Sequence, residues 1–535
     1  MTRTLTFVTL SAALIAAALS AQTPARTPPA PFDLDEVSIA DLQQRMQSGR
    51  ETARSIVEKY VARIEAVDRS GPAIHSIIEL NPDAPAIADR LDAERRNGHV
   101  RGPLHGIPVV IKDNIATADR MMTTAGSRAL AGAPAPKDAF IVARLREAGA
   151  IILGKTNLSE WANFRSTHST SGWSGRGGLS RNPYALDRNT SGSSSGTGAA
   201  IAASLAAVGV GTETDGSIVS PSNVNGLVGI KPTLGLVSRT GIVPIAHSQD
   251  TAGPMARTVA DAAALLGVLA GVDADDRATA ALAGKNTRDY SQSLDAAGLK
   301  GARIGVVRNR LFGYNPAADR IAEEAIADMK NAGAVVIDPT NIPTLGQFDD
   351  TEFDVLLYEF KADLDKYLKS LGPLAPVHSL KDVIAFNDAH HAEEMPYFGQ
   401  EIMTMAEKKG PLTDPKYRAA LSRNHRLSRT LGIDAVMTAH KLDALVAPTG
   451  GPAWLTDLVN GDGGTSNAAS PSTVTSVAGY PHITVPAGFV RGLPVGVSFF
   501  GRAWSEATLV RIAYAYEQAT KHRRPPTFAP TADLK

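Results

Sequence analysis

The residues of this chain best suited to chemistry are one lysine and several serines. Lys112 ends an apolar run, residues 106–111, where the chain would leave a buried strand. A glycine- and serine-rich stretch follows at 191–198, and a second turn, at 211–218, contains Ser217. A lysine that burial keeps uncharged can act as a base toward a serine hydroxyl. The pattern therefore predicts a serine hydrolase that uses an amine as its base.

Lys112 also has an ordinary structural interpretation. A lysine at a strand end often extends its ammonium into water or pairs with a neighbouring acid, here Asp113. The local pattern leaves both interpretations open. The two serine-rich segments favour the catalytic one, because a proton relay needs hydroxyl groups beside the amine.

Residues 149–156 match the phosphate-loop pattern G-x-x-x-x-G-K-T. A phosphate loop needs a strand before its first glycine and exposed N–H groups between its glycines. Here the spacer residues, 150–153, are apolar and form the expected strand themselves. We therefore interpret the segment as a buried strand followed by a turn, and expect no nucleotide.

A G-x-S-x-G pattern, typical of a nucleophile elbow, centres on Ser194. That motif follows a hydrophobic strand, whereas residues 181–189 are polar. An elbow would also need a later acid and histidine, for which Asp250 with His247 or His482 is available. A glycine–serine linker without chemistry is the remaining alternative.

No metal and no cofactor are expected. The chain has no cysteine, which excludes a cysteine nucleophile and a cysteine-bound zinc. His390 and His391 lie beside Glu393 and Glu394, but without the H-E-x-x-H spacing of a zinc site. Charged residues on an exposed helix face explain this cluster.

The composition is that of a large globular protein. The chain has 535 residues, of which 43% are apolar and 20% charged. Its formal net charge is zero, so no basic excess indicates a nucleic-acid partner. No feature of the sequence indicates an oligomeric state.

The N-terminus resembles an export signal. Arg3 precedes an apolar run, residues 5–19, which ends in small residues suited to cleavage. A membrane anchor is the alternative, but the run is short for a bilayer. We expect a signal peptide over 1–20, a linker rich in proline and alanine over 21–33, and a periplasmic or secreted protein with no stable membrane association after cleavage.

Hydrophobic periodicity predicts an α/β protein with one large domain over 34–535. Strand, helix and strand signals alternate twice, which predicts parallel pairing, at 105–111, 137–148 and 150–153 and at 302–307, 317–331 and 334–337. Two capped helices are expected over 36–68, another over 82–97, and a helical cover over 352–429. Further signals predict a helix at 198–207, strands at 208–212, 445–447, 483–485 and 496–500, and a closing helix at 505–520.

Five segments in order resemble the amidase signature family, over nearly all of the chain after residue 36. They are Pro103-Leu104-His105-Gly106-Ile107-Pro108 through Lys112-Asp113-Asn114, Gly154-Lys155-Thr156-Asn157, residues 191–198, residues 213–222 and Gly229-Ile230-Lys231-Pro232-Thr233. The resemblance implies a large mixed central sheet covered by helices on both faces.

It also implies a Ser–Ser–Lys triad. The family's lysine falls on Lys112, its bridging serine on Ser193 and its nucleophile on Ser217. The backbone N–H groups of Thr214, Asp215, Gly216 and Ser217 match the family's oxyanion turn. We further expect Ser194 and Trp454 to contact the substrate, although ordinary packing is the alternative for the tryptophan.

The sequence departs from the family pattern at two glycines. Ser191 and Asp215 each precede a glycine where the family usually has Gly-Gly. The aspartate variant resembles the exported bacterial peptide amidases, which remove the C-terminal amide of peptides. We therefore expect a carboxamide hydrolase that forms a seryl acyl-enzyme and acts on peptide or small-molecule amides.

Three alternatives remain. They are a general aliphatic or aryl amidase, the amidase subunit of a tRNA-dependent amidotransferase, and a binding protein on an inactive amidase scaffold. The leader argues against the amidotransferase, and the intact triad argues against the inactive scaffold.

Overall fold

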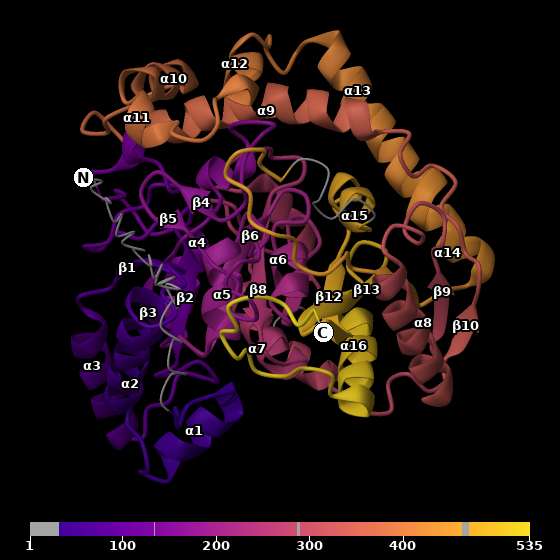
Figure 1. Ribbon diagram of the computed structural model, residues 1–535, viewed down its shortest axis with the longest axis horizontal. Coiled ribbons are helices and arrows are strands. Elements are labelled where there is room, and N and C mark those ends of the chain that lie inside the picture. The colour runs from indigo at the N-terminus through magenta and orange to yellow at the C-terminus, as the bar shows by residue number, and fades with distance from the viewer. Residues whose placement is uncertain (1–30, 133, 286–288, 463–469, 535) are drawn as a thin grey trace, which may run out of the picture.

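One mixed sheet of eleven strands organises the structure (Figure 1). The computed structural model describes residues 31–132, 134–285, 289–462 and 470–534. The expected signal peptide lies outside the described residues, as does most of the expected linker. The strands, in their order across the sheet, are β1 (Ile77–Leu80), β3 (Ile151–Thr156), β2 (Pro108–Lys112), β6 (Val208–Glu213), β8 (Thr251–Ala256), β7 (Val228–Lys231), β12 (His482–Val490), β13 (Leu493–Phe500), β11 (Ala444–Pro448), β9 (Arg303–Val306) and β10 (Val335–Ile337).

Helices pack along this sheet in two groups. In one group α4, α7, α16 and α8 contact one another in turn, and in the other α5 contacts α6. The predicted class, a large mixed sheet with helices packed on it, is confirmed. The α-helices are α1 (Ile39–Gln47), α2 (Ala53–Ile64), α3 (Ala84–Arg96), α4 (Phe140–Glu147), α5 (Ser195–Ala202), α6 (Val219–Val224), α7 (Val259–Leu269), α8 (Pro316–Asn331), α9 (Asp349–Ser370), α10 (Leu380–Ala389), α11 (His391–Glu394), α12 (Glu401–Glu407), α13 (Pro415–His425), α14 (Asp434–His440), α15 (Ser472–Ala478) and α16 (Glu506–Thr520).

Both expected strand–helix–strand units form. β2 pairs in parallel with β3 after the crossover through α4, and β9 pairs in parallel with β10 after α8. The first two helices begin at the predicted caps: Ser38 and Thr52 each accept a hydrogen bond from the N–H three residues on, within a capping box. These elements follow from local signals alone.

The register of three neighbouring strands positions the candidate residues. β2 and β6 run in parallel, with Ile111 opposite Val210, so Lys112 reaches the sheet edge beside Thr212. β6 and β8 run antiparallel, with Glu213 opposite Thr251. The chain leaving β6 therefore lies against the chain entering β8.

Small residues let α5 lie close to β6. Every residue of α5 is buried, and its sequence is SGTGAAIA. A Cβ at Gly209 of β6 would lie 2.6 Å from Thr197 Cγ2 of this helix. This close approach brings Ser193, two residues before α5, to the sheet edge.

Helices α9 to α13 arch over one end of the sheet, in orange in Figure 1. α9 is the longest of them at 22 residues. Residues 352–429, expected to be helical, lie mostly within these five helices. No helix in the described ranges is long and apolar enough to cross a membrane.

One local prediction needs correction, and several short elements were not predicted. The helix expected at 198–207 spans 195–202, because Ser204 takes a left-handed conformation that ends it. The polar segment 156–189 contains the hairpin β4 (Trp173–Ser174) and β5 (Gly178–Leu179) and a 3₁₀ turn. The short helical turns, two of them π-helical (65–69 and 426–433), are Glu65–Arg69, Arg128–Leu130, Glu160–Asn163, Arg277–Leu282, Tyr290–Ser293 and Arg426–Ile433.

Candidate active site

Three polar side chains meet in a line at the edge of the sheet. Lys112 Nζ lies 2.7 Å from Ser193 Oγ, and Ser193 Oγ lies 3.1 Å from Ser217 Oγ. Lys112 and Ser193 are fully buried, whereas Ser217 is 8% exposed. The peptide bond between Gly192 and Ser193 is cis. The structure thus brings together the three residues that the resemblance implied.

Each of the three comes from a different element. Lys112 is the last residue of the buried strand β2. Ser193 lies just before α5, and Ser217 lies in the turn between β6 and α6. Because parallel strands β2 and β6 end at the same edge, the chemistry of both strand ends converges there.

The Lys112 amine lies among three oxygen atoms. Besides Ser193, its Nζ lies 3.3 Å from the carbonyl oxygen of Thr212 and 2.9 Å from Thr212 Oγ1. A neutral amine has two N–H donors and one lone pair. In that form Lys112 can donate both hydrogens to Thr212 and accept from the Ser193 hydroxyl, whereas an ammonium donates to all three oxygens, Ser193 Oγ included.

Burial lowers the pKa of Lys112 from 10.5 to about 7. The negative charges of Asp250 and Glu213 oppose that fall. The alternative pairing with Asp113 does not form, since Asp113 Oδ2 accepts from the Thr124 hydroxyl and lies 3.6 Å from Arg176 Nη1. Lys112 therefore neither reaches solvent nor pairs with its neighbour.

The turn after β6 presents free N–H groups beside Ser217. Within the described part of the chain, the backbone N–H groups of residues 214–217 donate to no other group. Gly216 has a φ of +78°, a conformation that favours glycine. Glu213 fixes the far side of the turn by accepting from the N–H groups of Ile218 at 2.7 Å and Val219 at 3.0 Å.

Asp215 lies in this turn, and its side chain bonds to α15. Its Oδ2 accepts from Thr473 Oγ1 at 2.7 Å. Burial raises the pKa of this carboxyl, against the bonds from Ser472 and Thr473. A raised pKa lessens the negative charge near the turn, which suits a site that must stabilise an anion.

A cavity of about 420 Å³ opens beside the turn. Asp215 and Gly216 of the turn form one side, together with Ser191 and Gly192. Trp454 lines it, and its Nε1 donates to Asp462 Oδ1 at 3.2 Å. Ser194 does not line this cavity: it is fully buried, and its hydroxyl donates to the carbonyl of Thr212 at 3.1 Å.

The other sequence motifs have structural roles. Lys155 of the phosphate-loop lookalike is buried in β3 and donates to the carbonyl of Ile115 at 2.6 Å and to Thr123 Oγ1 at 2.8 Å. His482 is buried, and its Nε2 lies 2.6 Å from Ser498 Oγ. Ser194 bonds to the backbone of Thr212 and not to His482, so no elbow triad forms between these two residues.

The acidic cluster near residue 390 is only partly exposed. His390, His391 and Glu393 are exposed as expected, but Glu394 is buried. Its carboxylate accepts from Ser127 Oγ at 3.1 Å and from the N–H of Arg128 at 3.0 Å. Glu394 therefore joins α11 to the loop before Arg128 and takes part in packing.

A different histidine meets two acids. His247 Nδ1 lies 2.8 Å from Asp363 Oδ2, and its Nε2 lies 3.5 Å from Glu359 Oε1. These three residues are close enough to share a ligand. The two ring nitrogens face different carboxylates, which is the arrangement of a protonated imidazole, whereas a metal needs a deprotonated nitrogen. The bond to Asp363 and the charge of Glu359 raise the pKa of His247 despite burial.

Thr212 and Asn114 had no role assigned from the sequence, and Asp250 was considered only as the acid of a nucleophile elbow. Thr212 accepts from Lys112 and also from Asn114 Nδ2, the latter at 3.0 Å. Asp250 accepts from Thr214 Oγ1 at 2.6 Å. Only the pairing of β6 with β2 and β8 reveals these contacts, because the residues are far apart in sequence.

Comparison with known proteins agrees with this geometry. The amidase family model matches residues 55–510. A probable amidase of Arabidopsis thaliana is 42% identical over 506 residues, covering 93% of this chain and 92% of that protein. A glutamyl-tRNA(Gln) amidotransferase subunit of Symbiobacterium thermophilum is 35% identical over 494 residues, covering 91% and 97%. The structure of native peptide amidase from Stenotrophomonas maltophilia has a TM-score of 0.89 at 51% identity, covering 93% of this chain and 100% of that one.

Proposed function

The chain belongs to the amidase signature family and is an amidase, and on this premise we propose that it removes the C-terminal amide of peptides. The observation that most directly supports amide hydrolysis by a serine nucleophile with a lysine base is the unbroken contact from Lys112 through Ser193 to Ser217. A buried amine in contact with one serine, and through it with a second serine that is 8% exposed and follows the cavity-lining Gly216, is suited to activate a nucleophile.

The relay would act in both directions. Lys112, as the neutral amine, takes the proton of Ser193, which takes the proton of Ser217. Ser217 Oγ then attacks the amide carbonyl, and the N–H groups of residues 214–217 stabilise the oxyanion. Loss of one such donor typically costs about 3–4 kcal/mol of transition-state stabilisation. The same protons return along the relay to the leaving nitrogen, so ammonia departs and a seryl ester remains.

Hydrolysis of the ester repeats these steps with water. Water gives its proton to the relay as it attacks the ester carbonyl. The proton returns to Ser217 Oγ as the ester bond breaks, and the carboxylic acid leaves. The balance is one water consumed and one ammonia released for each amide, with no redox change.

The cavity favours substrates without a carboxylate at the scissile end. Among its described lining residues the charged ones are Asp215 and Asp462, and none is a lysine or arginine. A free C-terminal carboxylate would find no cationic side chain among these lining residues, whereas a neutral primary carboxamide needs none. The similarity to peptide amidase structures supports the same substrate class.

A substrate panel tests this proposal. The purified chain is given N-acetylated dipeptide amides, a short aliphatic amide, an aryl amide and the matching peptide acids, and ammonia is measured. We expect release from the peptide amides at the highest kcat/KM. Comparable kcat/KM for the aliphatic or aryl amides would favour a general amidase and refute the peptide preference.

Two serine variants control for nucleophile loss. Ser217→Ala is expected to abolish ammonia release. Ser222→Ala is its matched control, because Ser222 is a buried serine of the following helix α6 whose hydroxyl has no partner in the described structure. Full activity in Ser217→Ala would contradict the assigned nucleophile.

The amidotransferase alternative is testable in the same experiment, because one relative, 35% identical, belongs to an amidotransferase. Ammonia released by the isolated chain supports a stand-alone amidase. Ammonia that requires added partner proteins supports the alternative. Tight binding of a peptide amide without turnover would indicate an inactive scaffold.

We also propose that the protein is exported to the periplasm or secreted. The charged start, apolar run and small residues of segment 1–20 support this proposal. N-terminal sequencing of the mature protein from an exported fraction tests it. Retention of Met1 in a cytoplasmic fraction would refute it.

A further inference from the structure

Sheet register places Asp250 against the turn that carries the free N–H groups. Glu213 of β6 pairs with Thr251 of β8, so Asp250, one residue before β8, faces Thr214, one residue after β6. Thr214 is the first of the four residues whose backbone N–H groups donate to no other group in the described part of the chain. Asp250 is thus a direct neighbour of the oxyanion turn from a separate strand.

The Asp250 carboxylate makes three bonds there. Its Oδ1 accepts from Thr214 Oγ1 at 2.6 Å. Its Oδ2 accepts from the backbone N–H groups of Ile245 at 2.8 Å and Ala246 at 2.9 Å. The adjacent Gln249 donates from Nε2 to the carbonyl of Thr214 at 3.2 Å. Thr214 is therefore fixed at both its side chain and its carbonyl.

Asp250 also affects the base electrostatically. The charged groups that act on Lys112 are Asp250, which has the larger effect, and Glu213. Arg239 acts on Asp250 in turn and donates two bonds to Asp276, from Nε at 2.9 Å and from Nη2 at 2.5 Å.

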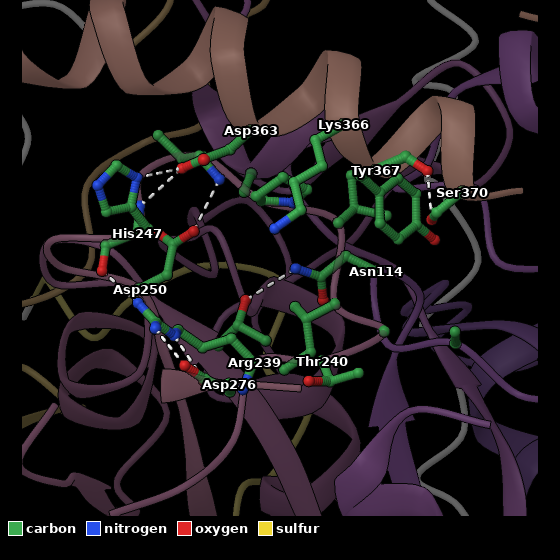
Figure 2. A pocket seen from close by; sticks show the side chains of 18 of the residues that line it. Asn114, Arg239, Thr240, His247, Asp250, Asp276, Asp363, Lys366, Tyr367 and Ser370 are labelled. Atoms are coloured by element: carbon green, nitrogen blue, oxygen red, sulfur yellow. Dashed lines mark hydrogen bonds and ion pairs between the residues drawn. The ribbon is translucent and has the colours of Figure 1, made fainter. Parts of the chain in front are cut away.

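The surroundings of Asp250 leave Thr214 as its only side-chain partner among the described residues. It lines a second cavity of about 460 Å³, together with Asn114, Arg239 and His247 (Figure 2). His247 pairs with Asp363 instead. This cavity shares no described lining residue with the cavity of about 420 Å³ beside the turn. Asp250 therefore does not line the cavity beside the turn, in which we propose that the substrate binds.

We propose that Asp250 is a positioning residue of this site, which fixes Thr214 in the oxyanion turn. Its negative charge also opposes the loss of the Lys112 proton. The inference rests on the proposed relay. The two effects oppose each other: the first favours catalysis, and the second reduces the fraction of neutral base.

Asp250→Asn separates charge from shape. Removing a negative charge near Lys112 disfavours the ammonium, so the acid limb of the pH–rate profile is expected to move to lower pH by about half to one unit. The plateau kcat is expected to fall about tenfold, less than the loss of a whole oxyanion donor. A purely structural role would lower kcat and leave the limb in place.

A second pair of variants leaves the charge in place. Thr214→Val removes the hydroxyl bonded to Asp250, and Thr214→Ser keeps it. The valine variant is expected to lose about tenfold in kcat with an unmoved limb, and the serine variant to retain activity near that of the wild type. This pair keeps the proposal testable if Asp250→Asn fails to fold.

The matched control is Asp261→Asn. Asp261 is a buried aspartate of α7 that accepts from the N–H of Ile39 at 3.0 Å, and it is not among the groups acting on Lys112. Its loss is expected to lower thermal stability without moving the limb. An unmoved limb in folded Asp250→Asn, or wild-type kcat in Thr214→Val, would overturn the proposal.

A probe that bypasses amide turnover distinguishes this inference from the proposed function. A fluorophosphonate reacts with an activated serine, whose oxygen displaces fluoride, so its labelling rate reports the relay directly. If the wild type releases no ammonia but labels with a limb that shifts in Asp250→Asn, the substrate assignment fails and the role of Asp250 stands.

Discussion

The acid limb of the pH–rate profile should belong to Lys112. Burial lowers its pKa from 10.5 to about 7, because no water solvates the ammonium in the fully buried pocket. At about 1.36 kcal/mol per pKa unit, the surroundings disfavour the charged form by about 5 kcal/mol. The neutral base then makes up about half of the protein near pH 7 and about a hundredth near pH 5.

The direction of the pH dependence follows from the protonation state of Lys112 that reacts. The neutral amine is active, so the rate rises with pH, about tenfold per unit below pH 7, and levels off above it. Ammonia release from an N-acetylated peptide amide, which has no titrating group of its own, measures kcat/KM from pH 5 to pH 10. Circular dichroism at each pH verifies that the protein stays folded.

One neighbour could imitate this limb. Burial raises the pKa of Asp250 to about 6, close enough to give a similar curve. Deprotonation of an amine is strongly endothermic, whereas that of a carboxylic acid is nearly athermal, so the limb is measured at two temperatures. A limb that stays in place on warming, or a rate that falls between pH 7 and pH 9, would refute the assignment to Lys112.

Three further variants test other parts of the site. Lys112→Met should be inactive. Unfolding restores the ordinary pKa of lysine, so the wild type gains stability as pH rises from 7 to 10, and the advantage of Lys112→Met in unfolding free energy should shrink by about 3–4 kcal/mol over that window. Urea titrations at both pH values measure this difference, and an unchanged difference would contradict a neutral buried amine. Gly216→Ala should lower kcat at least tenfold with little change in KM, since φ is +78° and a Cβ would lie 3.3 Å from Ser472 Oγ; steady-state kinetics decide, and unchanged kcat would place the oxyanion turn elsewhere. Trp454→Ala should raise KM several-fold for peptide amides with kcat nearly unchanged, as expected where a residue binds substrate and transition state equally; a loss confined to kcat would argue against a binding role.

The sequence predicted those elements whose signals are local. Capping boxes at Ser38 and Thr52 and the two strand–helix–strand alternations were sufficient for the first helices and for β2, β3, β9 and β10. β7 and β8 were not predicted. β7 is only four residues long, and β8 reads Thr-Ala-Gly-Pro-Met-Ala, with a glycine and a proline that disfavour strands. These strands form because their neighbours in the sheet satisfy their backbone groups.

The same distinction applies to the site. Lys112, Ser193 and Ser217 were identified through the family's motifs, whereas Thr212 and Asp250 needed the register of β6 with its neighbours. Ser194 shows the opposite limit. It lies next to Ser193 in sequence, but the start of α5 directs its hydroxyl to the backbone of Thr212 and away from the cavity. The sequence around a serine therefore does not determine the direction of its side chain at the start of a helix.

The exposure of the three relay residues explains why two serines are used. A lysine must be shielded from water to stay neutral near pH 7, but a nucleophile must reach the substrate. Lys112 and Ser193 are fully buried, and Ser217 alone borders the accessible region at 8% exposure. Direct contact between the amine and the nucleophile would place the amine at the cavity wall, where solvation would favour the ammonium. Ser193 carries the proton between the nucleophile and the amine while Lys112 stays shielded from water. A variant that admits water to Lys112 should therefore raise the pKa of Lys112 and lose activity at neutral pH, even with Lys112, Ser193 and Ser217 all present.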